Sequence, residues 1–94
     1  MAYKLAFKNS AWAEWQALDG AVRAQFKKVL LRRLEEPHVL SAKLRDLPNC
    51  YKIKLRALGY RLVYQVSDTE VTVTVITVGK RERNKVYTTA KPRL

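Results

Sequence analysis

Histidine and cysteine are almost absent from this chain of 94 residues, which has one of each, His38 and Cys50. A lone cysteine cannot form a disulfide within the chain, and one histidine with one cysteine cannot supply the ligands of a structural zinc site. We therefore expect no metal and no other cofactor. His38 follows the helix-ending Pro37 and is expected to be a loop histidine without a role. Cys50 is expected to be a small residue at the start of a strand.

Long apolar runs are also absent, because lysines such as Lys4 and Lys8 interrupt them. No segment is therefore long enough to cross a bilayer or to act as a targeting sequence. The hydrophobic content of 48% is nevertheless enough to build one core. These features predict a soluble, cytoplasmic protein without membrane contact, folded as a single domain over residues 1–94.

Acidic residues are scarce. Eight Asp and Glu stand against 19 Lys and Arg, which gives a formal net charge of +11. Most of this excess lies in residues 37–94. A charge this one-sided indicates a polyanionic or strongly acidic partner.

Residue patterns predict a strand followed by two helices in the first part of the chain. Apolar residues alternate over residues 2–7, which is the period of a half-buried strand. Asn9 or Ser10 can cap a short helix. Its Trp12 and Trp15 could face a partner, but their helical spacing with Leu18 favours the core. A second helix begins after the break at residues 19–20 and ends at Pro37.

The second part of the chain predicts a loop over residues 38–49 and then three strands. The strands cover residues 51–56, 60–66 and 71–78, and their short connections indicate an antiparallel meander. Gly79 is expected to end the sheet. The last residues are expected to form a basic tail that is weakly helical around residues 81–87, because Pro92 prevents a long helix.

These elements predict an α+β fold in the order β-α-α-β-β-β. A helical hairpin packs on one face of a small antiparallel sheet, and a short basic C-terminal tail or helix follows. The other face of the sheet is expected to be open.

The predicted meander has a basic face. Lys52, Lys54 and Arg56 share one side of their strand, because successive side chains point in opposite directions. Arg61 falls on the same face of the next strand. A two-residue turn would place Lys54 opposite Arg61, and a shift of the turn would instead pair Arg56 with Arg61.

Either pairing sets two cations against each other without an acidic residue in either strand. This pattern resembles a vacant anion site. Three interpretations remain open: a solvated face that protects a sheet edge, a face that binds nucleic acid, and a catalytic site.

Such a face has the groups that RNA cleavage by the 2′-hydroxyl needs. A lysine crowded by other cations has a lowered pKa, so Lys52 or Lys54 could act as the base. Arg61 and Arg81 stay protonated and are suited to holding phosphate oxygens. Tyr87 could stack on an unpaired base.

Three stretches resemble the RelE toxins of the RelE/ParE toxin–antitoxin superfamily. They are Cys-Tyr-Lys-Ile-Lys-Leu-Arg at 50–56, Gly-Tyr-Arg-Leu-Val-Tyr-Gln-Val at 59–66, and Val-Gly-Lys-Arg-Glu-Arg at 78–83 with Tyr87. The similarity extends to Met-Ala-Tyr at the start and Lys-Leu-Arg at 43–45, and it covers nearly the whole chain.

The resemblance implies a metal-independent endoribonuclease that cleaves messenger RNA in the ribosomal A site and inhibits translation. It places the active site on Lys52, Lys54, Arg61, Arg81 and Tyr87. The lysines would activate the 2′-hydroxyl and stabilise the transition state, Arg61 would hold the phosphate, and Tyr87 would orient the base. The resemblance assigns proton donation to Arg81, although the very high pKa of arginine favours charge stabilisation.

Further basic residues are expected to bind RNA. These are Arg45, Arg56, Lys80, Arg83, Lys27 and Lys28. The basic residues of the second helix, which are Lys27, Lys28, Arg32 and Arg33, could instead form a solvated face. The resemblance also implies a cognate acidic antitoxin of the RelB type, the ribosome with its 16S ribosomal RNA, and operator DNA contacted indirectly through the antitoxin. The alternatives are a gyrase poison of the ParE type and a noncatalytic ribosome- or RNA-binding module.

Overall fold

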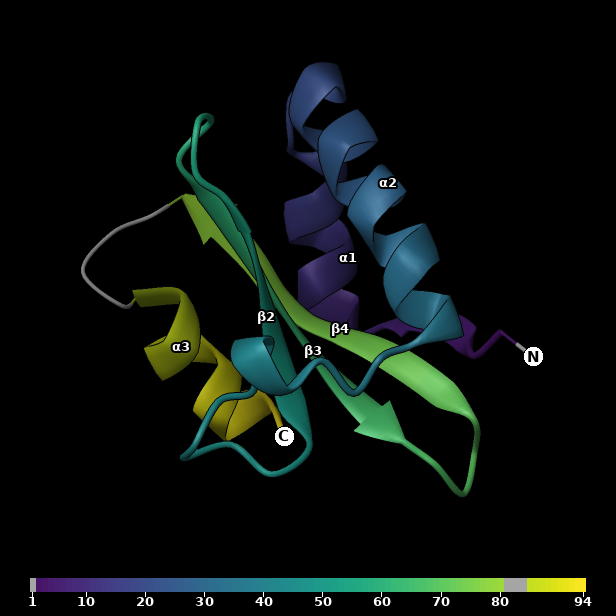
Figure 1. Ribbon diagram of the computed structural model, residues 1–94. Coiled ribbons are helices and arrows are strands. Elements are labelled where there is room, and N and C mark those ends of the chain that lie inside the picture. Colours follow the sequence, from purple (N-terminus) through teal and green to yellow (C-terminus); the bar gives the residue numbers. More distant parts are fainter. Residues whose placement is uncertain (1, 81–84) are drawn as a thin grey trace.

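Four strands form one sheet in this computed structural model, which describes residues 2–80 and 85–94. The sheet order is β1-β4-β3-β2. The strands are β1 (Lys4–Phe7), β2 (Cys50–Leu55), β3 (Tyr60–Ser67) and β4 (Thr72–Lys80). The helices are α1 (Asn9–Gln16), α2 (Gly20–Glu35) and α3 (Lys85–Ala90), with short 3₁₀ turns η1 (Leu40–Ala42) and η2 (Lys91–Arg93). Figure 1 shows α1 and α2 on one side of the sheet and α3 on the other.

The α+β class and the helical hairpin are confirmed, and so is the antiparallel meander of β2, β3 and β4. The sheet as a whole is mixed, however, because β1 pairs with β4 in parallel from Lys4–Thr72 to Phe7–Val75. Alternation along residues 2–7 predicts a strand but carries no information about its partner or direction. The prediction of a purely antiparallel sheet is wrong for this strand.

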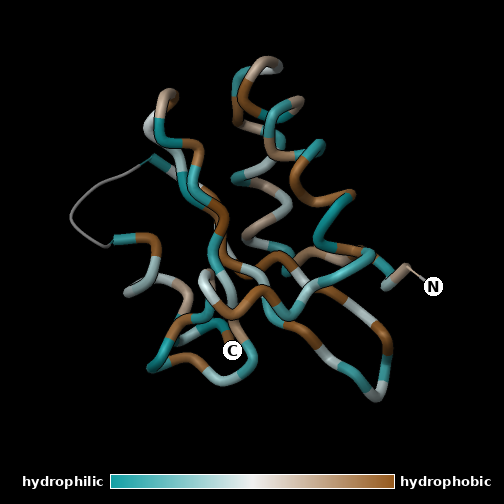
Figure 2. Tube along the Cα trace, in the orientation of Figure 1, coloured by the Kyte–Doolittle hydropathy of each residue, from teal (hydrophilic) through white to brown (hydrophobic). Residues whose placement is uncertain are grey.

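The larger core lies between the helical hairpin and the sheet. Val22, Phe26 and Leu30 project from α2 onto buried residues of β2, β3 and β4. Figure 2 shows hydrophobic and hydrophilic residues alternating along α2, as expected for a helix with one buried side. Trp15 packs against this core, but Trp12 is 46% exposed and lies edge-on to Phe7. The expectation that both tryptophans face the core is therefore wrong for Trp12.

A second, smaller core lies on the other face of the sheet, beneath α3. It consists of Leu47, Cys50, Val63, Ile76, Val86 and Ala90. The expectation of an open face is therefore wrong over this area, because α3 covers it and buries Val86 and Ala90 against the sheet. Burial raises the pKa of the Cys50 thiol to about 11, so the thiol is protonated and inert at neutral pH.

Gly79 does not end the sheet. It pairs with Arg61 of β3, and β4 continues to Lys80. A glycine interrupts a strand only where its backbone departs from the extended form, and here the ladder to β3 keeps it extended. This continuation brings the end of β4 beside the basic face.

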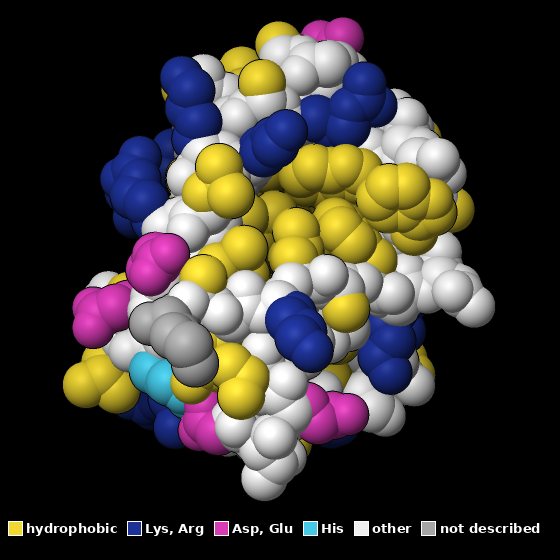
Figure 3. All heavy atoms as spheres, turned by 90° about the vertical axis from the view of Figure 1, so that its right-hand side faces the viewer, with side chains coloured by type: hydrophobic (Ala, Val, Ile, Leu, Met, Phe, Trp, Pro, Cys, Tyr) yellow, Lys and Arg dark blue, Asp and Glu magenta, His cyan; other side chains and the backbone are white. Residues whose placement is uncertain are grey.

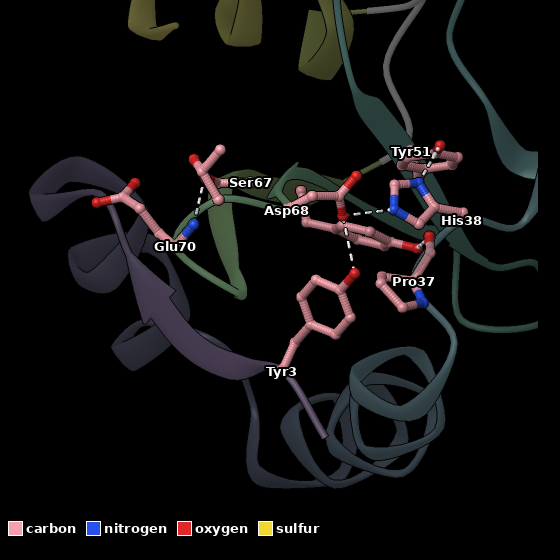
Figure 4. Close-up of polar contacts among 9 residues, drawn as sticks. Tyr3, Pro37, His38, Tyr51, Ser67, Asp68 and Glu70 are labelled. Carbon is pink, nitrogen blue, oxygen red and sulfur yellow. Dashed lines mark hydrogen bonds and ion pairs between the residues drawn. The ribbon is translucent and has the colours of Figure 1, made fainter. Parts of the chain in front are cut away.

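His38 has a structural role, contrary to expectation. Its Nε2 atom lies 2.8 Å from a carboxylate oxygen of Asp68, and its Nδ1 atom lies 2.9 Å from the hydroxyl of Tyr51. The hydroxyl of Tyr3 donates to the same Asp68 oxygen at 2.8 Å (Figure 4). These contacts tie the loop after α2 to β1, β2 and the β3–β4 turn.

Within the described residues, no helix is long and apolar enough to cross a membrane.

Candidate active site on the basic face of the sheet

Lys54 and Arg61 are direct cross-strand partners in the antiparallel pair of β2 and β3. Their register follows from the turn, since pairing ends at Leu55–Tyr60 and the Gly59 N–H donates to the Leu55 carbonyl at 2.8 Å. Gly59 has φ 72°, a left-handed conformation that glycine adopts without strain. Of the two predicted pairings, the structure has Lys54 opposite Arg61.

Two further cations complete what we call the basic cluster, which consists of Lys52, Lys54, Arg56 and Arg61. Lys52 lies two residues before Lys54 on the same face of β2, and Arg56 begins the turn. The three residues of the cluster that lie in strands are half-buried, whereas Arg56 is exposed. The predicted clustering of these four residues is therefore confirmed by the fold.

The basic cluster lines two hollows that share Lys54 and Arg56. One has a volume of about 240 Å³ and also includes Tyr60 and Arg61. The other has a volume of about 300 Å³ and includes Lys52. Among the described residues, neither hollow has an acidic residue in its lining. The positive charge there is thus available to an anion from outside.

The like charges within the cluster act on Lys54. The ammonium group of Lys52 lowers the pKa of Lys54, and desolvation and the guanidinium groups of Arg61 and Arg56 lower it further. A lysine whose charged form is disfavoured gives up its proton more readily than a free one. The lowered pKa makes Lys54 a candidate proton acceptor.

Tyr87 reaches the cluster from α3. Its hydroxyl accepts a long hydrogen bond of 3.4 Å from Nη1 of Arg61, and the Arg61 guanidinium carbon lies 5.7 Å from the centre of the Tyr87 ring. The sequence predicts only a weakly helical basic tail around this tyrosine. The structure places it on α3, which packs against the sheet. Tyr87 and Arg61 are thus brought together although 26 residues separate them.

Tyr87 also borders a third hollow of about 580 Å³ between α3 and the loop that precedes β2. Arg45 and Lys91 line this hollow together with Leu44 and Leu47. The structure therefore places Arg45 beside Tyr87, whereas the sequence indicates only that it is basic.

The other predicted RNA-binding residues are more scattered. Lys80 is exposed at the end of β4, opposite Tyr60. Lys27 and Lys28 are exposed on α2, which packs on the opposite face of the sheet from α3, and they line none of the three hollows. Arg81 and Arg83 lie outside the described residues.

Arg33 of α2 also belongs to this site, whereas the sequence indicates only a solvated helix face or an RNA contact for it. Its Nη1 atom donates to the Lys52 carbonyl at 3.2 Å and to the Tyr64 hydroxyl at 2.9 Å, and its side chain lines the same hollow as Lys52. Its spacing from Phe26 and Leu30 puts Arg33 on the side of α2 that faces the sheet, but it does not show that α2 ends beside β2. Arg33 adds a fifth positive charge at the edge of the basic cluster.

Comparison with known proteins gives a family match over most of the chain. The model of the family described as the ParE toxin of the type II toxin–antitoxin system, parDE, matches residues 5–85. The mRNA interferase toxin RelE of Escherichia coli (strain K12) is 55% identical over 94 residues, which cover 100% of this chain and 99% of that protein. The mRNA interferase RelE of Shigella flexneri has the same identity and coverage.

Solved structures show the same fold. A double arginine mutant of the E. coli toxin RelE in the free state superposes with a TM-score of 0.92 at 53% identity, covering 100% of this chain and 99% of that one. A chain of the intact E. coli RelBE toxin–antitoxin complex superposes with a TM-score of 0.84 at 56% identity, covering 87% of this chain and 100% of that one.

Proposed function

We propose that this chain cuts messenger RNA, starting from the fact that it belongs to the RelE/ParE family of toxins of type II toxin–antitoxin systems. Relatives 55% identical to it are named mRNA interferases, and one face of its own sheet carries the basic cluster. The observation that carries the proposal is the direct pairing of Lys54 with Arg61 next to Lys52. A cationic pair without a counter-charge fits a phosphodiester as its ligand.

The reaction we propose is attack of a 2′-hydroxyl on the adjacent phosphorus atom. Lys54 takes the proton of the 2′-hydroxyl, the 2′-oxygen bonds to phosphorus, and the bond from phosphorus to the 5′-oxygen breaks. Arg61 and Lys52 stabilise the negative charge that develops on the phosphate oxygens. The new bond from the 2′-oxygen to phosphorus leaves a 2′,3′-cyclic phosphate, and the departing 5′-oxygen takes a proton from water to give a 5′-hydroxyl end.

Two further residues complete the proposed site. Tyr87 presents a half-buried ring beside Arg61, so an unpaired base can stack on it while its phosphate reaches the cluster. Arg81 follows directly on Lys80 at the end of β4, and the proposed role is a hydrogen bond to the departing oxygen. Arg45 and Lys91 would contact the RNA on the far side of Tyr87.

The setting we propose is the cytoplasmic ribosome, with the message in the A site and the exposed lysines of α2, Lys27 and Lys28, against 16S ribosomal RNA. A domain of 10.9 kDa holds few nucleotides by itself, so additional phosphate contacts would dock it. The exposure of Lys27 and Lys28, which lie outside the three hollows, supports such additional contacts.

We further propose a cognate antitoxin with an acidic, amphipathic toxin-binding segment. Figure 3 shows hydrophobic side chains gathered in a hollow on one face, with Lys and Arg above it. The exposed apolar residues of the chain include Leu5, Trp12, Leu31 and Val71. An acidic helix with one apolar side complements such a surface. Operator DNA would be contacted mainly by the antitoxin in this complex.

The experiment that tests the function uses ribosomes stalled on a defined message. Incubation with the purified protein should give cuts at a fixed position within the codon in the A site, mapped by primer extension. A ParE-type gyrase poison would leave the message whole and inhibit gyrase-dependent supercoiling. A noncatalytic binding module would sediment with ribosomes and cut nothing.

A further inference from the structure

The C-terminal turn of the chain is bound to its first helix by an ion pair. Arg93 of η2 donates from Nη1 to Oε1 of Glu14 at 2.9 Å and from Nη2 to Oε2 at 3.2 Å. The two residues are 79 positions apart in the chain. Both side chains are mostly buried, with 22% of Arg93 and 33% of Glu14 exposed. A bidentate, partly buried pair of this kind is stronger than a surface ion pair.

The same two side chains complete the open edge of β4. Strand β1 ends where Phe7 pairs with Val75, so among the described residues no strand flanks the backbone of β4 beyond that point on this side. Arg93 donates to the Ile76 carbonyl at 2.9 Å, and Glu14 accepts from the Val78 N–H at 3.3 Å. Unpaired backbone groups at a buried site cost free energy, so Glu14 and Arg93 together replace the missing strand.

Glu14 has one further partner that fixes its position. The hydroxyl of Thr77, which is 2% exposed, donates to Oε1 of Glu14 at 3.1 Å. The carboxylate is therefore held by β4 independently of Arg93, and it offers a rigid anchor to the C-terminal turn. Glu14 belongs to α1 and is fixed to β4, whereas Arg93, which it holds, belongs to the C-terminal segment that carries Tyr87.

The link to the active site runs through α3. This helix has six residues, too few to be stable without tertiary contacts. Val86 and Ala90 bury its inner side, and Arg93 fixes the turn that follows it. Tyr87 lies on the same helix and contacts Arg61. A helix that is also fixed at the turn after it keeps the orientation of its side chains, whereas the same helix without that contact slides or frays more easily.

We propose that Glu14 and Arg93 are positioning residues, which hold α3 so that Tyr87 stays beside Arg61. Neither residue lines a hollow of the basic cluster, so they act through the helix and not on the RNA. This inference rests on the proposed role of Tyr87 in cleavage, and its test is therefore built with one readout that does not depend on RNA.

The test compares four variants. Glu14→Gln and Arg93→Ala each break the ion pair, and Arg93→Lys keeps the charge but loses the bidentate geometry. The fourth variant combines Glu14→Gln with Arg93→Ala. Two further changes at exposed positions are controls for net charge: Glu35→Gln matches Glu14→Gln, and Lys4→Ala matches Arg93→Ala. Hydrogen exchange by mass spectrometry reports on residues 85–94, and single-turnover cleavage of stalled messages reports on the site.

We expect exchange in residues 85–94 to become at least about tenfold faster in both single variants, while the amides of β3 and β4 stay protected. The cleavage rate should fall about tenfold at unchanged ribosome affinity, and Arg93→Lys should recover part of it. The double variant should show the same exchange and cleavage rates as the more impaired single variant, because both single changes remove the same ion pair. The charge-matched controls should behave as the unmodified protein.

Unchanged exchange in residues 85–94 of both single variants would overturn the proposal. The proposal would also fail if Tyr87→Ala slows cleavage, whereas Glu14→Gln and Arg93→Ala speed exchange in residues 85–94 but leave the cleavage rate unchanged. A protein that cuts no RNA at all would overturn the proposed function instead, and the exchange measurement would still decide whether the pair holds α3. If Arg93→Ala also exposes β3 and β4, the milder Arg93→Lys supplies the comparison.

Discussion

Lys54 on β2 and Arg61 on β3 face each other directly across the ladder, with Lys52 next to them on the same face. Like charges in this position destabilise a sheet by roughly 0.2–1 kcal/mol. A bound phosphate turns the same arrangement into an attraction. If Lys54 and Arg61 form the centre of a ribonuclease site, changes to them and to their neighbours should alter cleavage in specific ways.

Arg61→Ala should abolish cleavage and leave the fold intact. The change relieves repulsion from Lys54 but removes the contact with the Tyr87 ring, which is worth roughly 0.5–1 kcal/mol. The two effects oppose each other, so the free energy of unfolding should change by less than about 1 kcal/mol. Urea titration followed by circular dichroism checks stability. A folded Arg61→Ala protein that cuts at the normal rate would refute the anion site.

Lys54→Arg should cost far more activity than Lys52→Arg. Arginine keeps the positive charge but cannot release its proton, so the substitution separates a base from an electrostatic group. The charge of Lys52 is the largest cause of the lowered pKa of Lys54. Single-turnover rates on stalled ribosomes measure the difference. If both variants cut at the rate of the unmodified protein, neither lysine acts as the base and both act only electrostatically.

The pH dependence of cleavage should reveal Lys54. The neutral amine is the active form, so the rate should rise with pH and level off below the usual pKa range of a lysine. Lys52→Gln removes the largest cause of the lowered pKa and should move the profile to higher pH. Rates measured from pH 6 to 9 check this, with Lys4→Gln as the control for net charge. A profile that does not move contradicts the role of Lys52.

Tyr87→Phe should keep most of the activity, and Tyr87→Ala should lose about one to two decades. Stacking on a base is worth roughly 1–3 kcal/mol and does not need the hydroxyl. The hydroxyl makes only a long hydrogen bond to Arg61, which Phe gives up at little cost. If Phe is as damaging as Ala, the hydroxyl takes part in the chemistry and the stacking role is wrong.

Acid should destabilise the protein partly through Glu14. Burial alone would raise the pKa of this carboxyl, but hydrogen bonds from Arg93, Val78 and Thr77 outweigh burial and lower it. The stability that Glu14 contributes is therefore present above the pKa of an unfolded glutamate and is lost as pH falls through the folded value. Glu14→Gln should flatten the fall in the free energy of unfolding between pH 6 and 3. A slope equal to that of the unmodified protein would show that Glu14 does not contribute.

The sequence predicts the basic cluster because alternation and a short turn are local properties. Lys54 and Arg61 are seven residues apart, and the pattern of Tyr51, Ile53 and Leu62 shows which face is buried. The contacts that complete the site are not local. Glu14 and Arg93, Arg33 and Lys52, and the two partners of His38 are joined only when helices and strands have packed. The position of α3 over the second core follows from packing alone.

The chemistry of the RNA ends distinguishes attack by the 2′-oxygen from attack by water. Messages cut on stalled ribosomes by the purified protein should have a 2′,3′-cyclic phosphate on the upstream fragment and a 5′-hydroxyl on the downstream one, because the 2′-oxygen is the attacking group. Treatment with polynucleotide kinase and mass spectrometry of the termini identify both ends. A 5′-phosphate on the downstream fragment would mean that water attacks the phosphorus, and it would contradict the role assigned to Lys54 and Arg61.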